Sequence, residues 1–373
     1  MVAGSGNDEL ILGDAADATR VWTIDGAFGR GNIDNEFFFE RFENLTGGNQ
    51  ADVFVFAGGS IDGTTDGGGG DDTLDYTVAS GDIEVNRQTR TGNFIGEYEN
   101  IEAVKGNASG NNTLVGADAD ANWNITGQNT GDIDGFDFEN FQNLTGGDSN
   151  DVFTVSASGS ITGKLRGTTT IGHVDDDKLD LAAKNESLDV DIQSTNAGIV
   201  SGGASVDFGS IENLVGGSAS DQFVLQPLTG LNGTIDGGVG AEDHLDFEAW
   251  SSSVNVTLDG AVNAGESYGG FVTGVERLTG GSANDVLTGN DSANRIIGLG
   301  GSDTINGLTG DNVLIGDFAV FASGSIVTDA RLNDGDDVIS AAGGNNIALP
   351  GFCLLYTSPS PRDLSTSRMP SSA

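Results

Sequence analysis

Cysteine and proline are scarce in this sequence of 373 residues. Cys353 is the only cysteine, and there are five prolines. A single thiol can form neither an intramolecular disulfide nor a site with several thiolate ligands, so the sequence excludes a disulfide framework and a zinc–thiolate centre. The fold must be stabilised by other means.

Positive charge is scarce as well. Fifteen Lys and Arg residues face 56 Asp and Glu residues, and the formal net charge is −41 at pH 7. Such a field repels nucleic acids, anionic lipid surfaces and acidic polysaccharides, whereas it attracts cations. We therefore expect no nucleic-acid partner, and the natural partner of this chain is a cation.

Long hydrophobic runs are missing. No stretch approaches the roughly 18 apolar residues of a membrane span, so we expect no membrane insertion. The N-terminal stretch MVAGSGNDEL lacks the charged and apolar regions of a signal peptide and reads like the middle of a repeat. Gly, Asp, Asn, Ser and Thr interrupt every apolar run within a few residues, which predicts almost no helix.

The last 21 residues differ from the rest of the chain. The segment 353–373, CLLYTSPSPRDLSTSRMPSSA, holds the only cysteine and three of the five prolines. It resembles the conceptual translation of a sequencing adapter. We therefore expect an artefactual, disordered tail that interrupts the natural chain, and we exclude it from the fold prediction.

Glycine, in contrast, is abundant and periodic. Between Gly280 and Asp317 the chain reads GGSANDVLT GNDSANRII GLGGSDTIN GLTGDNVLI GD. Three columns recur every nine residues in this run: Gly280, Gly289, Gly298, Gly307 and Gly316; Asp285, Asn294, Asp303 and Asn312; and Leu287, Ile296, Ile305 and Leu314. A period of nine fits neither a helix nor a simple strand, and it indicates a repeat architecture.

A longer and looser motif occupies the rest of the chain. It consists of an apolar residue, an acid or amide, any residue, Leu or Val, any residue, and Gly, and it begins at Phe42, Ile101, Phe141, Ile211 and Val275. Four copies continue to an aspartate five residues after the first glycine: Asp52, Asp151, Asp221 and Asp285. The unequal spacing of the copies indicates a degenerate array.

Short alternating segments such as Asp52–Phe56 (DVFVF) and Val254–Leu258 (VNVTL) lie between these motifs. Bounded by turn residues, they predict many short strands. One rung of this kind cannot bury its apolar face, but stacked rungs can. We predict an all-β, parallel β-solenoid, with a β-helix in the longer units and a tighter β-roll in the nonapeptides. A sandwich of antiparallel sheets is the competing architecture.

The predicted organisation has four parts. Residues 1–279 form the degenerate solenoid, 280–317 the nonapeptide β-roll, 318–352 a strand insertion with a further turn, and 353–373 the tail. The aromatic stretches Phe37–Leu45 (FFFERFENL) and Phe136–Leu144 (FDFENFQNL) repeat one pattern, which predicts that they stack in the core.

The run from Gly280 to Ile315 resembles the RTX family of glycine-rich nonapeptides, GGxGxDxUx, in which U is a large aliphatic residue. The resemblance implies a six-residue turn, a three-residue strand and two nonapeptides per coil. Glycine lets the turn expose its carbonyl oxygens and the sixth residue adds a carboxylate, a set of hard ligands that favours Ca²⁺.

Two nonapeptides per coil would stack turns that lie 18 residues apart. Asp285 would then lie over Asp303 on one edge, and Asn294 over Asn312 on the other. The first edge carries two carboxylates and should bind Ca²⁺ more strongly, while Asp291 and Asp311 could supply carboxylates to the second.

Isolated copies of the nonapeptide occur elsewhere. GGGGDDTLD from Gly67 matches every position and makes Asp71 and Asp72 candidate ligands. NDGDDVIS from Asn333 adds Asp337, which Asn346 follows nine residues later. GSGNDELIL from Gly4 matches in part, and GGVGAEDHL from Gly237 carries one extra residue.

No nucleophile motif, P-loop or zinc helix is present, so we expect no catalysis by this chain. His173 and His244 lie among acidic residues, which favours solvated loop histidines. The longer units resemble, less specifically, repeats of large secreted or cell-surface bacterial proteins. We expect an extracellular, calcium-binding structural or adhesin-like segment that could contact cell-surface or matrix ligands. The alternative is an accessory segment of a secreted carbohydrate-active enzyme whose catalytic domain is absent.

Overall fold

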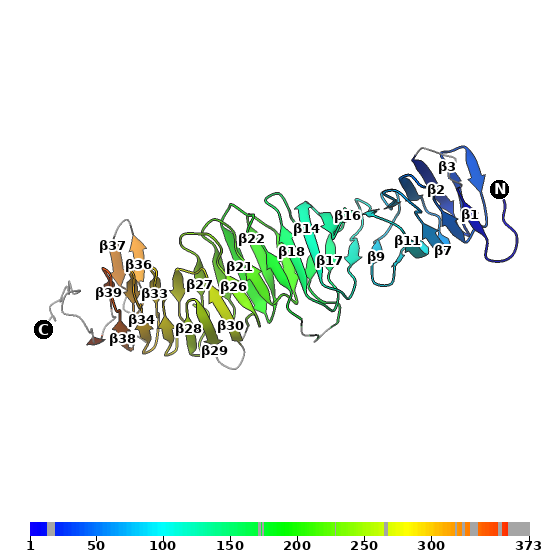
Figure 1. The fold of residues 1–373 in the computed structure, drawn as a ribbon. Coiled ribbons are helices and arrows are strands. Elements are labelled where there is room, and N and C mark those ends of the chain that lie inside the picture. Colours follow the sequence, from blue (N-terminus) through cyan, green and yellow to red (C-terminus); the bar gives the residue numbers. More distant parts are fainter. Residues whose placement is uncertain are drawn as a thin grey trace. The chain divides into compact units, whose positions relative to one another are not determined.

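The computed structural model describes residues 1–12, 19–170, 173, 175–227, 229–264, 268–317, 319–322, 325–328, 335–349 and 353–356. Within these ranges every regular element is a strand, and no helix of the length and hydrophobicity of a membrane span occurs. The chain divides into two compact units, residues 1–180 with 204–211, and residues 181–203 with 212–373. Figure 1 draws the strands of both.

The strands of the first unit form two rows in which most neighbours are parallel. The first row contains β1 (Glu9–Ile11), β5 (Asn44–Thr46), β7 (Ile61–Asp66), β9 (Glu84–Asn86), β10 (Thr91–Gly92), β11 (Ile95–Glu99), β13 (Thr113–Val115), β17 (Asn143–Thr145), β19 (Lys164–Arg166) and β23 (Val206–Gly209). The second contains β2 (Arg20–Gly26), β3 (Arg30–Ile33), β4 (Phe37–Phe39), β6 (Asp52–Phe56), β8 (Thr73–Asp75), β12 (Ala103–Lys105), β14 (Ala121–Gly127), β15 (Thr130–Ile133), β16 (Phe136–Glu139), β18 (Asp151–Val155) and β20 (Lys178–Asp180).

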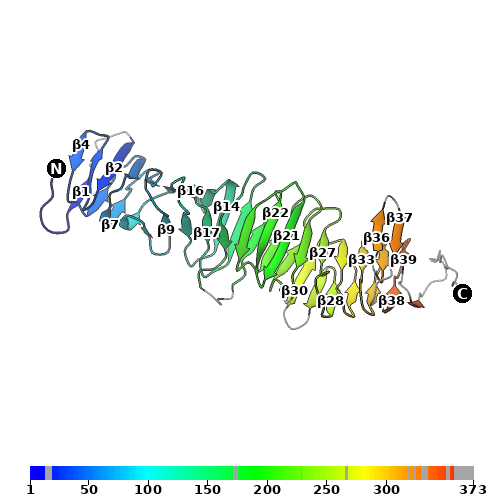
Figure 2. The same ribbon diagram turned by 180° about the vertical axis from the view of Figure 1, so that it is seen from behind.

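The second unit has the same construction. Its first row contains β21 (Leu188–Ser194), β22 (Ala197–Gly202), β25 (Gln222–Leu225), β27 (His244–Asp246), β31 (Arg277–Thr279), β33 (Arg295–Ile297), β35 (Val313–Ile315) and β39 (Ile347–Leu349). The second row contains β24 (Asn213–Val215), β26 (Thr234–Asp236), β28 (Val254–Thr257), β29 (Gly260–Ala264), β30 (Tyr268–Thr273), β32 (Val286–Thr288), β34 (Thr304–Asn306), β38 (Asp336–Ser340) and β40 (Cys353–Tyr356). A separate antiparallel hairpin joins β36 (Ala319–Ala322) to β37 (Ser325–Thr328), drawn in orange in Figure 2.

These parallel rows confirm the predicted β-solenoid. In the nonapeptide run, β32 pairs with β34 so that Leu287 faces Ile305, and β33 pairs with β35 so that Ile296 faces Leu314. All four side chains are 0% exposed. Strand pairing continues across residue 280, because β28 pairs with β32 and β31 with β33.

Antiparallel meanders interrupt the parallel rows, a feature that the sequence pattern did not predict. In the first unit β14 pairs antiparallel with β15, and β15 with β16, while β14 and β16 pair parallel with β18 and β12. The same motif joins β2 to β4 and, in the second unit, β28 to β30. Each meander adds antiparallel strands to one coil of the solenoid.

Aromatic side chains fill the core of the first unit. Trp22 stacks on Phe54 with ring centroids 5.4 Å apart, and Trp123 stacks on Phe153 at 5.1 Å. In the second aromatic stretch Phe138 and Phe141 are buried, as predicted.

In the first aromatic stretch, Phe37–Leu45, the prediction that the phenylalanines stack in the core is confirmed only in part. Phe39 and Phe42 are buried, but Phe37 and Phe38 are 63% and 67% exposed. The prediction of core stacking was therefore wrong for these two residues. They belong to β4, the last strand of its meander, which pairs with β3. Two of the three phenylalanines of β4 face solvent.

The predicted disordered tail is described only at its first four residues. Cys353–Tyr356 form β40, which pairs parallel with β38 and so differs from the expected disorder. Residues 357–373 lie outside the described residues, and for them disorder stays a prediction.

Candidate calcium site

The sixth residue of each nonapeptide is buried, although it is polar. Asp285, Asn294, Asp303 and Asn312 are between 1% and 3% exposed, and Asp337 is 0% exposed. In each turn the sixth residue immediately precedes a three-residue strand whose central side chain enters the core. Because side chains alternate along a strand, the sixth residue lies on the same inner side as that central residue. Burial of this kind requires hydrogen bonds or a counter-charge for each side chain.

Backbone hydrogen bonds connect the aspartates of one edge. The N–H of Asp285 donates to Oδ1 of Asp303 at 2.8 Å, across 18 residues. The N–H of Asp303 donates in turn to Oδ1 of Asp337 at 2.8 Å. The predicted 18-residue stacking therefore holds for Asp285 and Asp303, and Asp337 extends the edge although 34 residues separate it from Asp303.

The two carboxylates at the start of this edge differ in hydrogen bonding. Both oxygens of Asp285 accept backbone N–H groups, Oδ2 from Gly281 at 2.7 Å and Oδ1 from Val254 at 2.8 Å. Oδ2 of Asp303 is buried and has no hydrogen-bond partner among the described residues. Burial, together with the charges of Asp285, Asp337 and Asp317, raises the pKa of Asp303 to about 8.

The backbone around Asp303 presents a further oxygen. A methyl group added to Gly298 would lie 2.5 Å from the Gly316 carbonyl oxygen and closer still to Oδ2 of Asp303. Both oxygens therefore converge on a position that only glycine permits. A buried anionic oxygen without a donor beside a carbonyl oxygen fits Ca²⁺, which takes carboxylate and carbonyl ligands and would supply the missing positive charge.

The asparagine edge is also stacked at 18 residues, because the N–H of Asn294 donates to Oδ1 of Asn312 at 2.9 Å. Here the carbonyl groups of the turn receive hydrogen bonds from within the turn itself. The Asn312 amide Nδ2 donates to the carbonyl oxygens of Gly307 at 3.0 Å, Thr309 at 3.1 Å and Gly310 at 3.3 Å. The amide thus occupies the carbonyl groups that a cation would need, which explains physically why this edge should bind Ca²⁺ less well.

Position two of these turns shows why the repeat prefers glycine. Leu299 and Leu308 adopt φ angles of +81° and +52°, a left-handed conformation that L side chains adopt at a cost of roughly 1 kcal/mol. Each stands where the nonapeptide pattern has its second glycine. These departures from the pattern therefore keep the turn geometry and add strain.

The remaining predicted ligands differ in exposure. Asp72 is 0% exposed, whereas its neighbour Asp71 faces solvent. Asp311 is exposed, and its Oδ1 accepts the N–H of Asn345 at 2.7 Å. Asp72 therefore occupies the position equivalent to Asp303, whereas Asp71 and Asp311 lie on the outer side of their turns. Calcium ligation by these residues stays a prediction.

The structure also reveals carboxylates that sequence reasoning missed. The N–H of Asp221 donates to Oδ1 of Asp243 at 2.7 Å, and the N–H of Asp243 donates to Oε2 of Glu276 at 3.0 Å. In the first unit, the N–H of Asp72 donates to Oε2 of Glu102 at 2.8 Å. The acid at the second position of the longer motif is therefore an acceptor for the aspartate of the preceding coil. The invariable presence of an acid or amide at this position was the available signal.

The two histidines have different environments. His173 is exposed, as expected, but His244 is only 9% exposed within β27, so the prediction of a solvated loop was wrong for it. Its Nε2 lies 2.8 Å from Thr279 Oγ1, and burial lowers its pKa to about 4. His244 is therefore a neutral, structural side chain of the first row.

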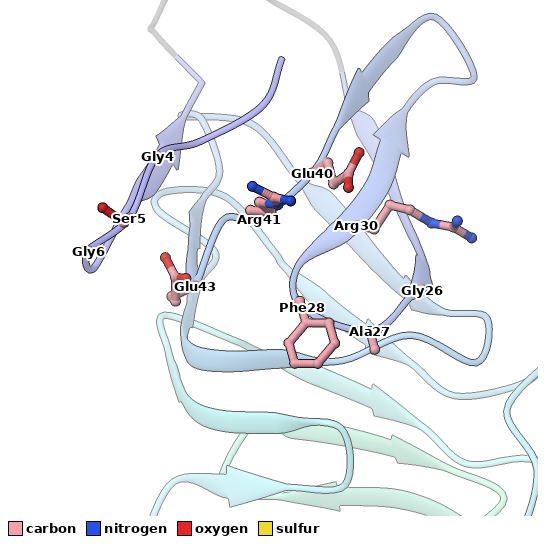
Figure 3. Close-up of a pocket in the computed structure, with 10 residues that line it drawn as sticks. All are labelled: Gly4, Ser5, Gly6, Gly26, Ala27, Phe28, Arg30, Glu40, Arg41 and Glu43. Atoms are coloured by element: carbon pink, nitrogen blue, oxygen red, sulfur yellow. The ribbon is translucent and has the colours of Figure 1, made fainter.

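A surface pocket of about 620 Å³ lies in the first unit, between residues 4–6, 26–30 and 40–43 (Figure 3). Phe28 is 74% exposed there, and Arg30 Nε donates to Asp25 Oδ1 at 3.1 Å. Arg41, Glu40 and Glu43 complete a mixed lining that contains no histidine. This pocket offers groups for binding at the surface of the first unit.

The comparison with curated proteins finds no match for this chain. A family model does match it, over residues 272–305, 297–318 and 331–348, all in the second unit. These ranges include Asp285, Asp303 and Asp337, the three aspartates of the hydrogen-bonded edge. The chain therefore carries RTX calcium-binding nonapeptide repeats, matched in four copies.

Proposed function

We propose that this chain is a calcium-binding structural or adhesin-like segment of a large secreted bacterial protein, and that it is not itself an enzyme. The observation that carries the proposal is the buried Oδ2 of Asp303, which lies inside the matched repeats and has no hydrogen-bond donor among the described residues. Parallel rows of short strands support a stalk or spacer role, because such rows extend by adding coils. Calcium would bind on export, since extracellular modules bind it at about 0.1–1 mM.

Calcium binding should be coupled to stability. An ion that binds only the folded state stabilises it by mass action, and it relieves repulsion among the buried carboxylates. The test is circular dichroism and thermal unfolding of the full chain, first with chelator and then with millimolar CaCl₂, with MgCl₂ as the control. We expect a substantially higher Tm with calcium than with magnesium. A β spectrum and Tm that ignore calcium would refute the proposal.

The alternative is an accessory segment of a secreted carbohydrate-active enzyme. The pocket in the first unit, with its exposed Phe28 and its arginine and glutamate side chains, is the feature that favours a surface contact with sugars. The uninterrupted reading frame separates the two proposals. Further repeats beyond both ends favour the structural segment, and a catalytic domain in the same frame favours the accessory segment.

A further inference from the structure

The pocket of the first unit lies at the tip of the hairpin that joins β2 to β3 (Figure 3). Two residues that line it have left-handed backbones, Phe28 with φ +62° and Arg41 with φ +68°. The N–H of Arg41 donates to the Phe28 carbonyl oxygen at 3.1 Å, so the two backbones are joined. A left-handed conformation is unfavourable for a residue with a large side chain, and strain of this kind is concentrated at functional sites.

The hairpin tip between β14 and β15 has the same backbone arrangement. The N–H of Asn129 donates to the Ser160 carbonyl oxygen at 2.9 Å, as the N–H of Gly29 does to that of Ser60 at 3.1 Å. Asn129 therefore stands where the first tip has Gly29. Its Oδ1 accepts the N–H of Thr162 at 2.9 Å, a bond that ties the tip to a later segment and that glycine cannot make.

The side chains beside these positions differ between the two tips. Gln128 corresponds to Phe28, and Asn140, with φ +61°, corresponds to Arg41. The second tip is thus neutral and polar, while the first carries an aromatic ring and a cation on the same backbone. Neither group is needed to build the hairpin, since the second tip forms without them. A departure of this kind from a repeated unit indicates a role other than folding.

The pocket presents hydrogen-bond donors and acceptors together. The guanidinium of Arg41 makes no hydrogen bond or ion pair with any of the described residues. Glu40 and Arg41 are exposed, and Glu43 uses one carboxylate oxygen to accept the N–H of Asp8 at 2.8 Å. Figure 3 shows the side chains of Glu40, Arg41 and Glu43 around the same opening. The donors of Arg41 and the acceptors of Glu40 are therefore available to a ligand.

Donors and acceptors in one pocket favour a ligand whose groups do both. A hydroxyl group donates and accepts, so a neutral sugar can accept from Arg41 and donate to Glu40. An anionic ligand would meet the charges of Glu40 and Glu43, and a cationic ligand would meet that of Arg41. Phe28 is 74% exposed and offers a ring face on which the C–H face of a sugar can stack.

The backbone around the pocket is already paired, which disfavours a peptide ligand. The N–H of Glu40 donates to the Met1 carbonyl oxygen, and the N–H of Ala3 donates to that of Glu40, both at 3.0 Å. The N–H of Phe42 donates to the Gly29 carbonyl oxygen at 3.4 Å. A peptide that binds as an added strand needs unpaired backbone groups. Side chains would therefore hold the ligand of this pocket.

We propose that the pocket around Phe28 and Arg41 is a binding site for neutral saccharides. The Phe28 ring stacks on a pyranose, and Arg41 and Glu40 form hydrogen bonds with its hydroxyl groups. The volume of about 620 Å³ is that of a small-molecule site. The inference rests on the proposed function, in which the chain contacts an external ligand, and it names the ligand class and the binding residues.

The main test removes the aromatic ring without adding strain. Phe28→Asn in the full chain introduces a side chain that tolerates the left-handed backbone, so the variant should fold with a Tm no lower than that of wild type. Phe38→Asn is the matched control, because Phe38 is 67% exposed in the same unit and does not line the pocket.

Binding is measured in two steps. An array of neutral, acidic and amino-sugar glycans, with a parallel peptide array, identifies the class of ligand that the wild type binds. Isothermal titration calorimetry with the neutral glycan that binds most strongly then gives the Kd of each variant. We expect the Kd to rise at least tenfold for Phe28→Asn and to stay within twofold of wild type for Phe38→Asn.

A second pair of variants tests the polar contact. Arg41→Gln removes the guanidinium and should raise the Kd about fivefold, whereas Arg166→Gln, at an exposed position of β19, should leave it unchanged. Circular dichroism checks that each variant folds. An unchanged Kd in folded Phe28→Asn and Arg41→Gln overturns the site. Binding of the wild type to acidic glycans or peptides alone, or to nothing on either array, overturns it as well.

Thermal unfolding with and without CaCl₂ separates this result from failure of the proposed calcium binding. If calcium raises the Tm of wild type but no neutral glycan binds, the saccharide site is wrong and the calcium-binding function stands. If a neutral glycan binds through Phe28 and the Tm ignores calcium, the saccharide site stands and the calcium-binding function is wrong.

Discussion

The backbone N–H of Asp285 donates a hydrogen bond to Oδ1 of Asp303, 2.8 Å away and 18 residues later. Two successive coils are thus joined through a buried carboxylate whose second oxygen has no donor in the part of the chain that the structure describes. One side chain therefore joins successive coils, and we propose that the same side chain binds a cation.

Asp303→Asn should lower the calcium affinity of the nonapeptide run by roughly tenfold or more, the equivalent of about 1.4 kcal/mol. An amide retains the acceptor for the Asp285 N–H but loses the charge that binds Ca²⁺. Asp336→Asn, at an exposed carboxylate in β38, is the control and should leave the affinity unchanged. Calorimetric titration of both full-length variants measures this. Equal affinities for Asp303→Asn and wild type would show that the aspartate edge does not bind calcium.

Asn312→Asp should make its turn dependent on calcium. The substitution removes the Nδ2 donor from the carbonyl groups of Gly307, Thr309 and Gly310, which should cost about 1–3 kcal/mol of unfolding free energy in chelator. Calcium should restore the loss, because a cation can replace the amide. Asn345→Asp, at an exposed position, is the control. Denaturant unfolding with and without calcium measures this difference in stability. A loss of stability that calcium does not reverse would contradict the prediction that a cation can replace the amide.

The stability of the calcium-free chain should rise as pH falls from 8 to 5. Burial raises the pKa of Asp303 to about 8 and those of Asp72 and Asp243 to about 7, against an ordinary value of 3.8. The folded state therefore binds these protons more tightly, and this contribution is full below about pH 4 and lost as pH rises through 7 to 8.

His244 acts in the opposite direction, because burial lowers its pKa from 6.5 to about 4 and its protonation favours unfolding. Three carboxyl groups outweigh this single imidazole above pH 5. Thermal unfolding in metal-free buffers of equal ionic strength measures the trend, and added calcium should reduce it by holding the carboxylates in the charged form. A calcium-free Tm that falls from pH 8 to pH 5 would contradict the assignment.

Phe141→Ala should cost about 3–5 kcal/mol of stability, since the side chain is 0% exposed in the core of the first unit. Phe38→Ala should change stability by no more than about 0.5 kcal/mol, because 67% of Phe38 is exposed. Denaturant unfolding of the two variants compares them directly. A similar loss for both would mean that β4 is covered in solution.

The nine-residue columns indicated the parallel coils and the inward Leu and Ile side chains, and the resemblance to the RTX nonapeptides implied the 18-residue stacking of Asp285 over Asp303. These features depend on local properties, because glycine fixes where the chain turns and alternation fixes which side chain enters the core. The net charge of −41 likewise indicated a cationic partner before any contact was known.

Only the tertiary structure showed that the carboxylates of Asp303 and Asp285 differ in the hydrogen bonds they accept. These bonds depend on which backbone N–H groups a neighbouring coil brings near each carboxylate. The same holds for Asp243, whose turn carries one residue more than the pattern, and for Glu102 and Glu276, which act on the preceding coil. The meanders that expose Phe37 and Phe38 were also hidden, since antiparallel and parallel strands share one alternating pattern. Strand alternation is a property of the local chain, but the partner of a strand or a carboxylate lies in another coil, 34 residues away in the case of Asp303 and Asp337 and further along the chain for β19 and β23.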